Sequence, residues 1–68
     1  MEFSTKVWLV RERLNMSQED LARALNVSYA TINRWENSKT KPIKMALGVF
    51  DNFCKSHGIS FDENEDRL

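Results

Sequence analysis

A single cysteine, Cys54, and a single histidine, His57, are the only residues of their kinds in this 68-residue chain. The sequence can therefore form no intrachain disulfide and no four-ligand zinc site, which stabilise many small domains. Stability has to come from one small core, because a chain of this length has room for a single domain. We expect no metal site, and we expect Cys54 to be a buried apolar residue and not a reactive thiol.

The small core also argues against an enzyme. A deep substrate cavity of about 300 Å³ or more is hard to house in a domain of this size. With one histidine and two glycines, the chain offers no Ser/His/Asp arrangement and no glycine-rich phosphate loop, and it has no pair of carboxylates placed for acid–base catalysis. We therefore expect a protein without catalytic activity and without a cofactor.

The N-terminal ten residues contain one short apolar run, Val7–Val10, preceded by Glu2 and Lys6. This pattern fits neither a signal peptide nor a membrane-spanning segment of roughly 18 residues, and no other part of the sequence fits one. We therefore expect a cytoplasmic protein that does not associate with membranes.

The charges are divided unevenly along the chain, although they cancel overall. Residues 1–50 hold eight Lys and Arg against five Asp and Glu, whereas residues 51–68 hold two against five. Such an asymmetry is typical of a body that binds a polyanion and carries an acidic tail, but either stretch could also be an ordinary solvated surface. We expect the domain to span residues 1–61, and we expect residues 62–68 to form an acidic, mobile tail.

Two short helices are expected in the first part of the chain. Ser4 or Thr5 can cap the first, and its apolar stripe repeats at three- and four-residue spacing until Asn15 and Met16 end it. Ser17 can cap the second, with Asp20 three positions later as in a capping box. The apolar residues that we expect to be buried in these helices are Val7, Val10, Leu14, Leu21, Ala22 and Leu25.

Two more helices are expected after Asn26, a residue that adopts a left-handed conformation at low cost. Ser28 can cap a third helix over 29–37, and Pro42 then forces a loop over 38–41. The fourth helix runs from Ile43 to a basic last turn and a glycine stop at Gly58. Its expected stripe is Met45, Ala46, Val49, Phe50, Phe53 and Cys54.

Three further expectations concern this last helix and the residues after it. Gly48 weakens the helix by about 1 kcal/mol relative to alanine, and its missing side chain leaves room for another helix to approach. Ile59 and Phe61 are placed to pack back onto the bundle. No stretch alternates as a strand would, so the fold class is all-α, a compact bundle of four to five short helices.

The spacing of apolar and small residues from Gln18 onward is typical of two helices that cross steeply about a tight turn. Ala22 is small where the helices approach each other, and Asn26 lies in the turn. The residues that seal this junction are Val27, Ile32 and Trp35. The less specific alternative is a small helical bundle without a recognition helix.

The stretch SQEDLARALNVSYATINRWENSKTKP resembles the helix-turn-helix family of phage lambda- and Cro-type repressors, the XRE-like bacterial regulators. The resemblance extends over 7–59 and implies a lambda repressor-like fold that binds double-stranded DNA. It implies backbone contacts from Ser17, Gln18, Asn37, Lys39 and Lys41. It implies base contacts from Tyr29, Ala30 and Arg34, and an ion pair between Arg11 and Glu36.

The helical geometry supports a polar reading face independently of the resemblance. With about 100° per residue and Ile32 at zero, Trp35 lies near about −60° and Glu36 near about 40°. The residues between about 100° and 200° are Ala30, Asn33, Arg34 and Asn37. Arginine and asparagine can fork onto guanine and adenine edges, so Asn33 joins the expected base contacts, although each of these side chains could equally be an ordinary solvated one.

The sequence departs from the family at two points. Ser38 stands where the family usually has glycine, so a left-handed cap there would cost roughly 1 kcal/mol. The chain is also neutral overall, with a pI near 6.6, so its non-specific affinity for DNA is expected to be modest.

Two functions from different classes remain open. The first is a sequence-specific transcriptional regulator, a repressor that occupies an operator as a homodimer, with the helix over 29–37 in the major groove. For its pairing surface we expect four aromatic and aliphatic residues: Phe50, Phe53, Ile59 and Phe61. The alternative is an antitoxin or adaptor whose main partner is a protein, with the acidic segment 51–68 either neutralising a basic partner or covering the chain's own DNA-binding face.

Overall fold

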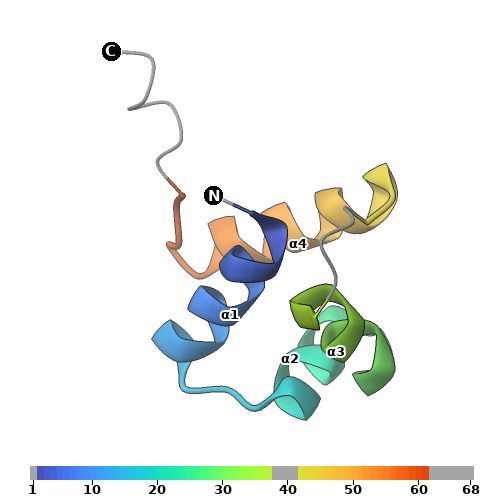
Figure 1. The fold of residues 1–68 in the computed structure, drawn as a ribbon. Coiled ribbons are helices and arrows are strands. Elements are labelled where there is room, and N and C mark those ends of the chain that lie inside the picture. The colour runs from blue at the N-terminus through green and yellow to red at the C-terminus, as the bar shows by residue number, and fades with distance from the viewer. Residues whose placement is uncertain (1, 38–41, 62–68) are drawn as a thin grey trace.

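The computed structural model describes residues 2–37 and 42–61 of the chain, and these residues form four helices and no strand (Figure 1). The helices are α1 (Phe3–Leu14), α2 (Gln18–Leu25), α3 (Tyr29–Asn37) and α4 (Lys44–Ser56). The expected all-α class is confirmed. The loop expected over 38–41, with Ser38 in it, and the tail expected over 62–68 lie outside the described residues.

Helix α1 begins earlier than its sequence indicates. We expected a cap at Ser4 or Thr5, but the helix starts at Phe3, and its N-cap Glu2 makes no side-chain capping bond. The reason is tertiary packing: the Phe3 ring lies edge-on to the rings of Trp35 and Phe50, with centroids 5.2 Å and 5.0 Å away. Burial of an aromatic side chain outweighs a missing cap, which is worth about 1 kcal/mol.

The two turns that flank α2 share one backbone conformation, which the sequence predicted for Asn26, whereas for Asn15 it predicted only the end of the first helix. Asn15 and Asn26 both adopt the left-handed conformation, with φ of 56° and 60°. The Ser17 hydroxyl accepts a hydrogen bond from the Asp20 N–H at 3.0 Å, and the Asp20 carboxylate accepts one from the Ser17 N–H at 3.1 Å. The capping box at the start of α2 is therefore confirmed, and it fixes where α2 begins.

The start of α3 is also anchored by a side chain. The Ser28 hydroxyl accepts a hydrogen bond from the Thr31 N–H at 3.1 Å, as expected for a residue that caps a helix. In the turn before it, the Val27 N–H donates to the Ala22 carbonyl at 2.9 Å. Both ends of the short connection between α2 and α3 are thus hydrogen-bonded.

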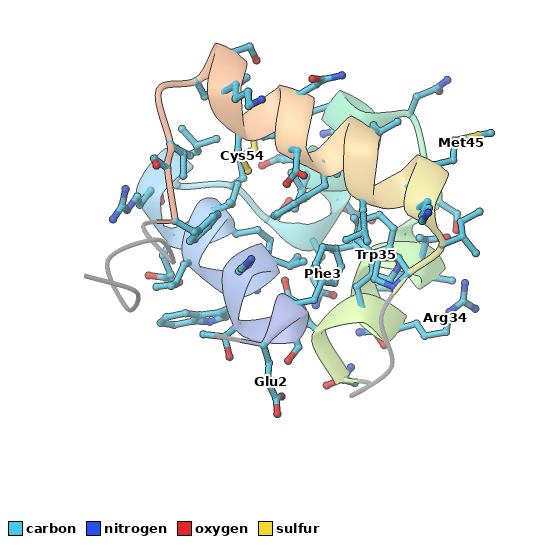
Figure 2. All side chains as sticks on the ribbon, turned by 90° about the horizontal axis from the view of Figure 1, so that it is seen from above. Glu2, Phe3, Arg34, Trp35, Met45 and Cys54 are labelled. Carbon is cyan, nitrogen blue, oxygen red and sulfur yellow. The ribbon has the colours of Figure 1, made fainter. Side chains whose placement is uncertain are left out.

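The core lies where α1, α2 and α3 meet the inner face of α4 (Figures 1 and 2). The residues with the largest fully buried side chains are Val7, Val10, Leu21, Ile32 and Phe50. Ala22 and Leu25 are buried as expected, whereas Leu14 is only partly buried against the core. This core holds α3 with Ile32 and Trp35 inward.

Helix α4 contributes less to the core than its apolar pattern indicates. Phe50 and Cys54 are buried, but Met45 and Val49 are 77% and 43% exposed, so the expectation that they belong to the buried stripe is wrong. The first turns of α4 project beyond the other helices (Figure 1), so only one side of them, at Ala46 and Leu47, packs against the core. For the same reason a Cβ on Gly48 would meet nothing within 4 Å, and the expected close approach there does not occur.

The chain after α4 folds back onto the core, as expected. Gly58 has a φ of 69°, and the Ile59 N–H then donates to the Cys54 carbonyl at 2.8 Å. Ile59 is buried and Phe61 packs against the core. Phe50 and Ile59 are thus core residues, which overturns the expectation that they form part of a pairing surface.

Candidate nucleic-acid interface

The outward face of α3 is the one surface of this helix that the other elements leave uncovered. Tyr29 is 51% exposed, and Ala30, Arg34 and Asn37 are also exposed. Arg34 extends away from the body of the molecule, whereas Trp35 beside it points toward Phe3 in the interior (Figure 2). The structure therefore brings three of the four expected base-contacting residues together on one exposed face.

The opposite edge of α3 is tied to α1 by an ion pair. Arg11 donates from Nε and Nη2 to the two carboxylate oxygens of Glu36, with the second bond 3.0 Å long. Its Nη1 donates to the Met16 carbonyl at 3.1 Å. The two side chains are only 17% and 10% exposed, and the hydrogen bond to Glu36 raises the pKa of Arg11 above its ordinary value.

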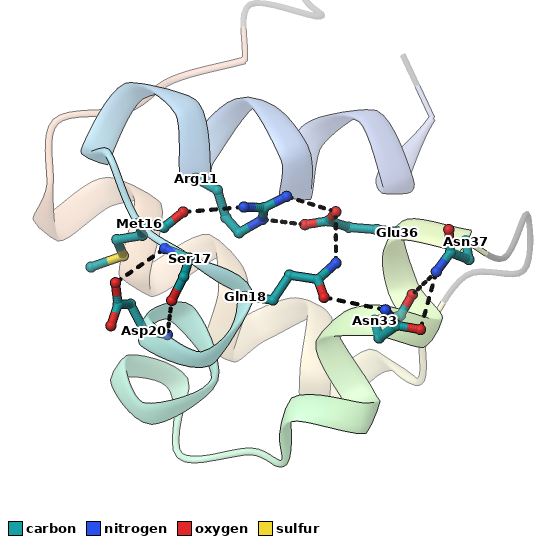
Figure 3. A network of polar contacts seen from close by, with 8 residues as sticks. All are labelled: Arg11, Met16, Ser17, Gln18, Asp20, Asn33, Glu36 and Asn37. Carbon is teal, nitrogen blue, oxygen red and sulfur yellow. Dashed lines mark hydrogen bonds and ion pairs between the residues drawn. The ribbon is translucent and has the colours of Figure 1, made fainter.

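The same carboxylate begins a chain of amide contacts that crosses from α2 to α3 (Figure 3). Gln18 donates from Nε2 to Glu36 at 3.0 Å, and Asn33 donates from Nδ2 to Gln18 Oε1 at 3.2 Å. Asn37 donates from Nδ2 to the carbonyl and to Oδ1 of Asn33, at 2.9 Å and 3.1 Å. We call these four residues, Glu36, Gln18, Asn33 and Asn37, the amide chain.

Three residues that the sequence indicated as DNA contacts form hydrogen bonds within the amide chain. Gln18 and Asn37 were expected at the DNA backbone and Asn33 at a base, and all three have partners within the protein. The spacing of residues along α2 and α3 does not indicate these contacts, because they depend on the rotamers and on the crossing angle of the two helices.

The remaining expected backbone contacts lie in different places. Ser17 is exposed at the start of α2, where its hydroxyl and its N–H take part in the capping box. Lys39 and Lys41 lie outside the described residues. Of these three residues, the structure thus describes Ser17 alone, at the exposed start of α2.

One aromatic residue beside α3 was not singled out from the sequence. Trp8 is 47% exposed on α1, and it lines a hollow of about 340 Å³ together with Ser4, Thr5, Glu36 and Asn37. The hollow lies between α1 and the C-terminal end of α3. The only sequence signal for it was that Trp8 falls outside the buried stripe of α1.

The described residues contain no group of three or more His, Cys, Asp and Glu side chains that could hold a metal ion. Cys54 is buried, and this burial raises the pKa of its thiol to about 11. The thiol is therefore protonated at neutral pH, which matches the expectation of an unreactive core cysteine. None of the helices in 2–37 and 42–61 is long and apolar enough to cross a membrane.

Comparison with known proteins places this arrangement in a family. A helix-turn-helix family model matches residues 9–42, from α1 through α3. The chain is 35% identical over 63 residues to the HTH-type transcriptional activator BcrR of Enterococcus faecalis, an alignment that covers 93% of this chain and 29% of that protein. No solved structure gives a significant match. The chain belongs to the helix-turn-helix family, in its Cro-type, XRE-like branch.

Proposed function

We propose that this chain is the DNA-binding part of a transcriptional regulator, and that it reads the major groove of double-stranded DNA with α3. The single observation that carries this proposal is the exposed face of α3 bearing Tyr29, Ala30 and Arg34 on a helix whose other sides are fixed by the core and by Glu36. A rigid helix with a polar outer face fits the major groove of B-DNA. The family supports the same function, and the matched relative is named as a transcriptional activator.

In this proposal Arg34 recognises a guanine. The guanidinium group presents two parallel N–H donors, which match the O6 and N7 acceptors of guanine in the major groove. Arg34 is exposed one turn into α3 and lies opposite the buried Ile32. Ala30 is placed to contact a thymine methyl group, and Tyr29 adds a hydroxyl and a ring at the start of the helix.

The sugar–phosphate backbone is held by residues on either side of α3. At the start of α2, Ser17 supplies its hydroxyl, and Gln18 supplies the second N–H of its Nε2, because its first is directed to Glu36. Asn37, Lys39 and Lys41 follow the reading face. Three lysines flank the reading helix, Lys39, Lys41 and Lys44. Neutralising about three phosphates per subunit predicts a slope of log affinity against log salt of roughly −3 per subunit. A slope near zero in titrations on a duplex would exclude DNA as the ligand.

The decisive experiment selects preferred duplexes from a random pool at one stated salt concentration with wild type, Arg34→Ala and Arg13→Ala. Arg13 is an exposed arginine on α1, so its variant carries the same change of charge away from α3. We expect Arg34→Ala to lose preference at one position of the site, at a cost of about 1–3 kcal/mol, and Arg13→Ala to keep every preference. If wild type enriches no sequence, the proposed function is wrong, and tight capture of a protein would favour the antitoxin or adaptor alternative.

We propose further that the chain acts as a homodimer on its operator. Two half-sites about one helical turn apart supply enough base contacts for specificity, and a symmetric protein pair reads them as a palindrome. The same selection tests this proposal, because a dimer enriches an inverted repeat whereas a monomer enriches a single half-site.

The direction of regulation is a separate proposal. Occupancy of an operator is sufficient for repression, and we propose that this chain acts as a repressor in the bacterial cytoplasm. A reporter gene placed behind the selected site tests this directly: repression is expected when the chain is produced. Activation, the activity for which the Enterococcus faecalis relative is named, would overturn it.

A further inference from the structure

The contacts of Asn33 give it a role that differs from base reading. We propose that Asn33 is a positioning residue that locks α3 onto α2 through Gln18, and that the carboxylate of Glu36 sets the direction of the whole amide chain. This inference rests on the proposed DNA-binding function. It assigns sequence specificity to Tyr29, Ala30 and Arg34, and Asn33 is no longer one of the residues that contact bases.

The direction of the amide chain follows from the chemistry of its first member. An ionised carboxylate accepts hydrogen bonds and cannot donate them, so Gln18 has to present Nε2 to Glu36, as it does at 3.0 Å. Its Oε1 then faces Asn33, which has to present Nδ2, as it does at 3.2 Å. The orientations of Gln18 and Asn33 are therefore dictated by Glu36.

The carboxylate is itself held in place from the other side. Arg11 engages both of its oxygens from α1, and the arginine is anchored in turn to the Met16 carbonyl at 3.1 Å. A guanidinium group stays protonated under all ordinary conditions. Glu36 is thus a fixed, charged acceptor, and the amide chain starts from a point that does not rotate.

The amide of Asn33 is occupied at both ends in this arrangement. A fork onto adenine requires one asparagine amide to aim its N–H and its oxygen at the base together. Here Nδ2 is directed to Gln18, and Oδ1 accepts a hydrogen bond from Asn37 at 3.1 Å. Turning the amide toward a base would leave Gln18 and Asn37 without these partners, in a side chain that is already half-buried.

Two classes of outcome are expected in sequence selection. Loss of a residue that contacts a base removes the base preference at one position of the site. Loss of a positioning residue weakens binding to every sequence alike. We expect Asn33→Ala to lower affinity for the best duplex by roughly 3- to 10-fold, the effect of one or two neutral hydrogen bonds, and to leave the preferred bases unchanged. Arg34→Ala in the same selection is the control that does change them.

Coupling between Gln18 and Asn33 provides a second test. If Asn33 acts through Gln18, the double variant Gln18→Ala with Asn33→Ala binds no more weakly than the weaker of the two single variants. Loss of preference at one base position in Asn33→Ala, whatever residue stands at 18, would overturn the proposal.

A measurement on the free protein separates this inference from the proposed function. The side-chain NH₂ groups of Gln18 and Asn33 should show slowed hydrogen exchange in NMR spectra, in contrast with that of Asn52, which is exposed on α4. Glu36→Gln removes the acceptor-only anchor, so both groups should then lose their protection. If wild type selects no duplex, the proposed DNA-binding function is wrong, but these spectra still test the amide chain. Hydrogen exchange at Gln18 and Asn33 as fast as that at Asn52 would refute the amide chain itself.

Discussion

Helix α3 is held on two sides by different kinds of contact, and the comparison shows what each kind provides. On the apolar side, Ile32 and Trp35 belong to the buried core cluster, in which the Phe3 ring contacts the rings of Trp35 and Phe50. On the polar side, Glu36 accepts hydrogen bonds from Arg11 and Gln18. Hydrophobic burial has no preferred direction, whereas hydrogen bonds have strict angular requirements. The apolar side therefore supplies most of the stability of α3, and the polar side fixes its rotation and register.

The largest effect is expected from breaking the apolar side. Phe50 is 1% exposed and contacts Phe3 edge-on at 5.0 Å. Phe50→Ala should lower the free energy of unfolding by about 3–5 kcal/mol, a large part of the stability of so small a domain. Denaturant unfolding followed by circular dichroism measures this. Met45→Ala is the control on the same helix, because a side chain 77% exposed should change the stability by less than about 0.5 kcal/mol.

The next largest effect is expected from breaking the polar side. Glu36→Ala leaves the Arg11 guanidinium without its partner in a site that is 17% exposed. We expect a loss of about 2–3 kcal/mol, between the roughly 0–1 kcal/mol of an exposed pair and the roughly 3–5 kcal/mol of a fully buried one. A melting temperature within a degree or two of wild type would show that the pair does not hold α3. Glu36→Gln, which keeps the shape of the side chain, should lose less stability than Glu36→Ala.

The two sides of α3 also differ in how far the sequence predicts them. The apolar side follows from the spacing of Val7, Val10, Leu21 and Ile32, because burial on a helix needs only the right period. The caps at Ser17, Asn15 and Asn26 follow from local chemistry, which acts within a few residues. Such features are predictable because they do not depend on where distant parts of the chain lie.

The amide chain could not be predicted from the sequence. Neither could the number of apolar residues of α4 that are buried in the core. The ion pair of Arg11 and Glu36 was indicated by family resemblance alone, and nothing indicated the contacts of Gln18 and Asn33. These depend on how two helices cross and on which rotamers then meet. Met45 fits the apolar period of α4, but period alone cannot say that the helix extends beyond the elements that would cover it.

Substitutions of the two glycines should change the stability by smaller amounts and in opposite directions. They test how much of α4 is covered by the apolar core. A Cβ at Gly48 meets nothing within 4 Å, so Gly48→Ala should stabilise the protein by about 1 kcal/mol or slightly less through helix propensity. Gly58 has a φ of 69° at the end of α4, so Gly58→Ala should destabilise it by about 1 kcal/mol. Thermal melts of the two variants measure this. A destabilised Gly48→Ala would mean that α4 is covered on its outer face.

The smallest effect is expected from a charge that belongs to neither side of α3. Hydrogen bonds from Ser17, first from its N–H and then from its hydroxyl, lower the pKa of Asp20 below its usual 3.8. The folded state thus favours the ionised carboxylate, and this contribution to stability is present above the unfolded pKa and is lost as the pH falls through the folded one. Between pH 6 and pH 3 the melting temperature of Asp20→Asn should therefore fall less than that of wild type. Equal falls in the two proteins would mean that the capping box does not make the stability of α2 depend on pH.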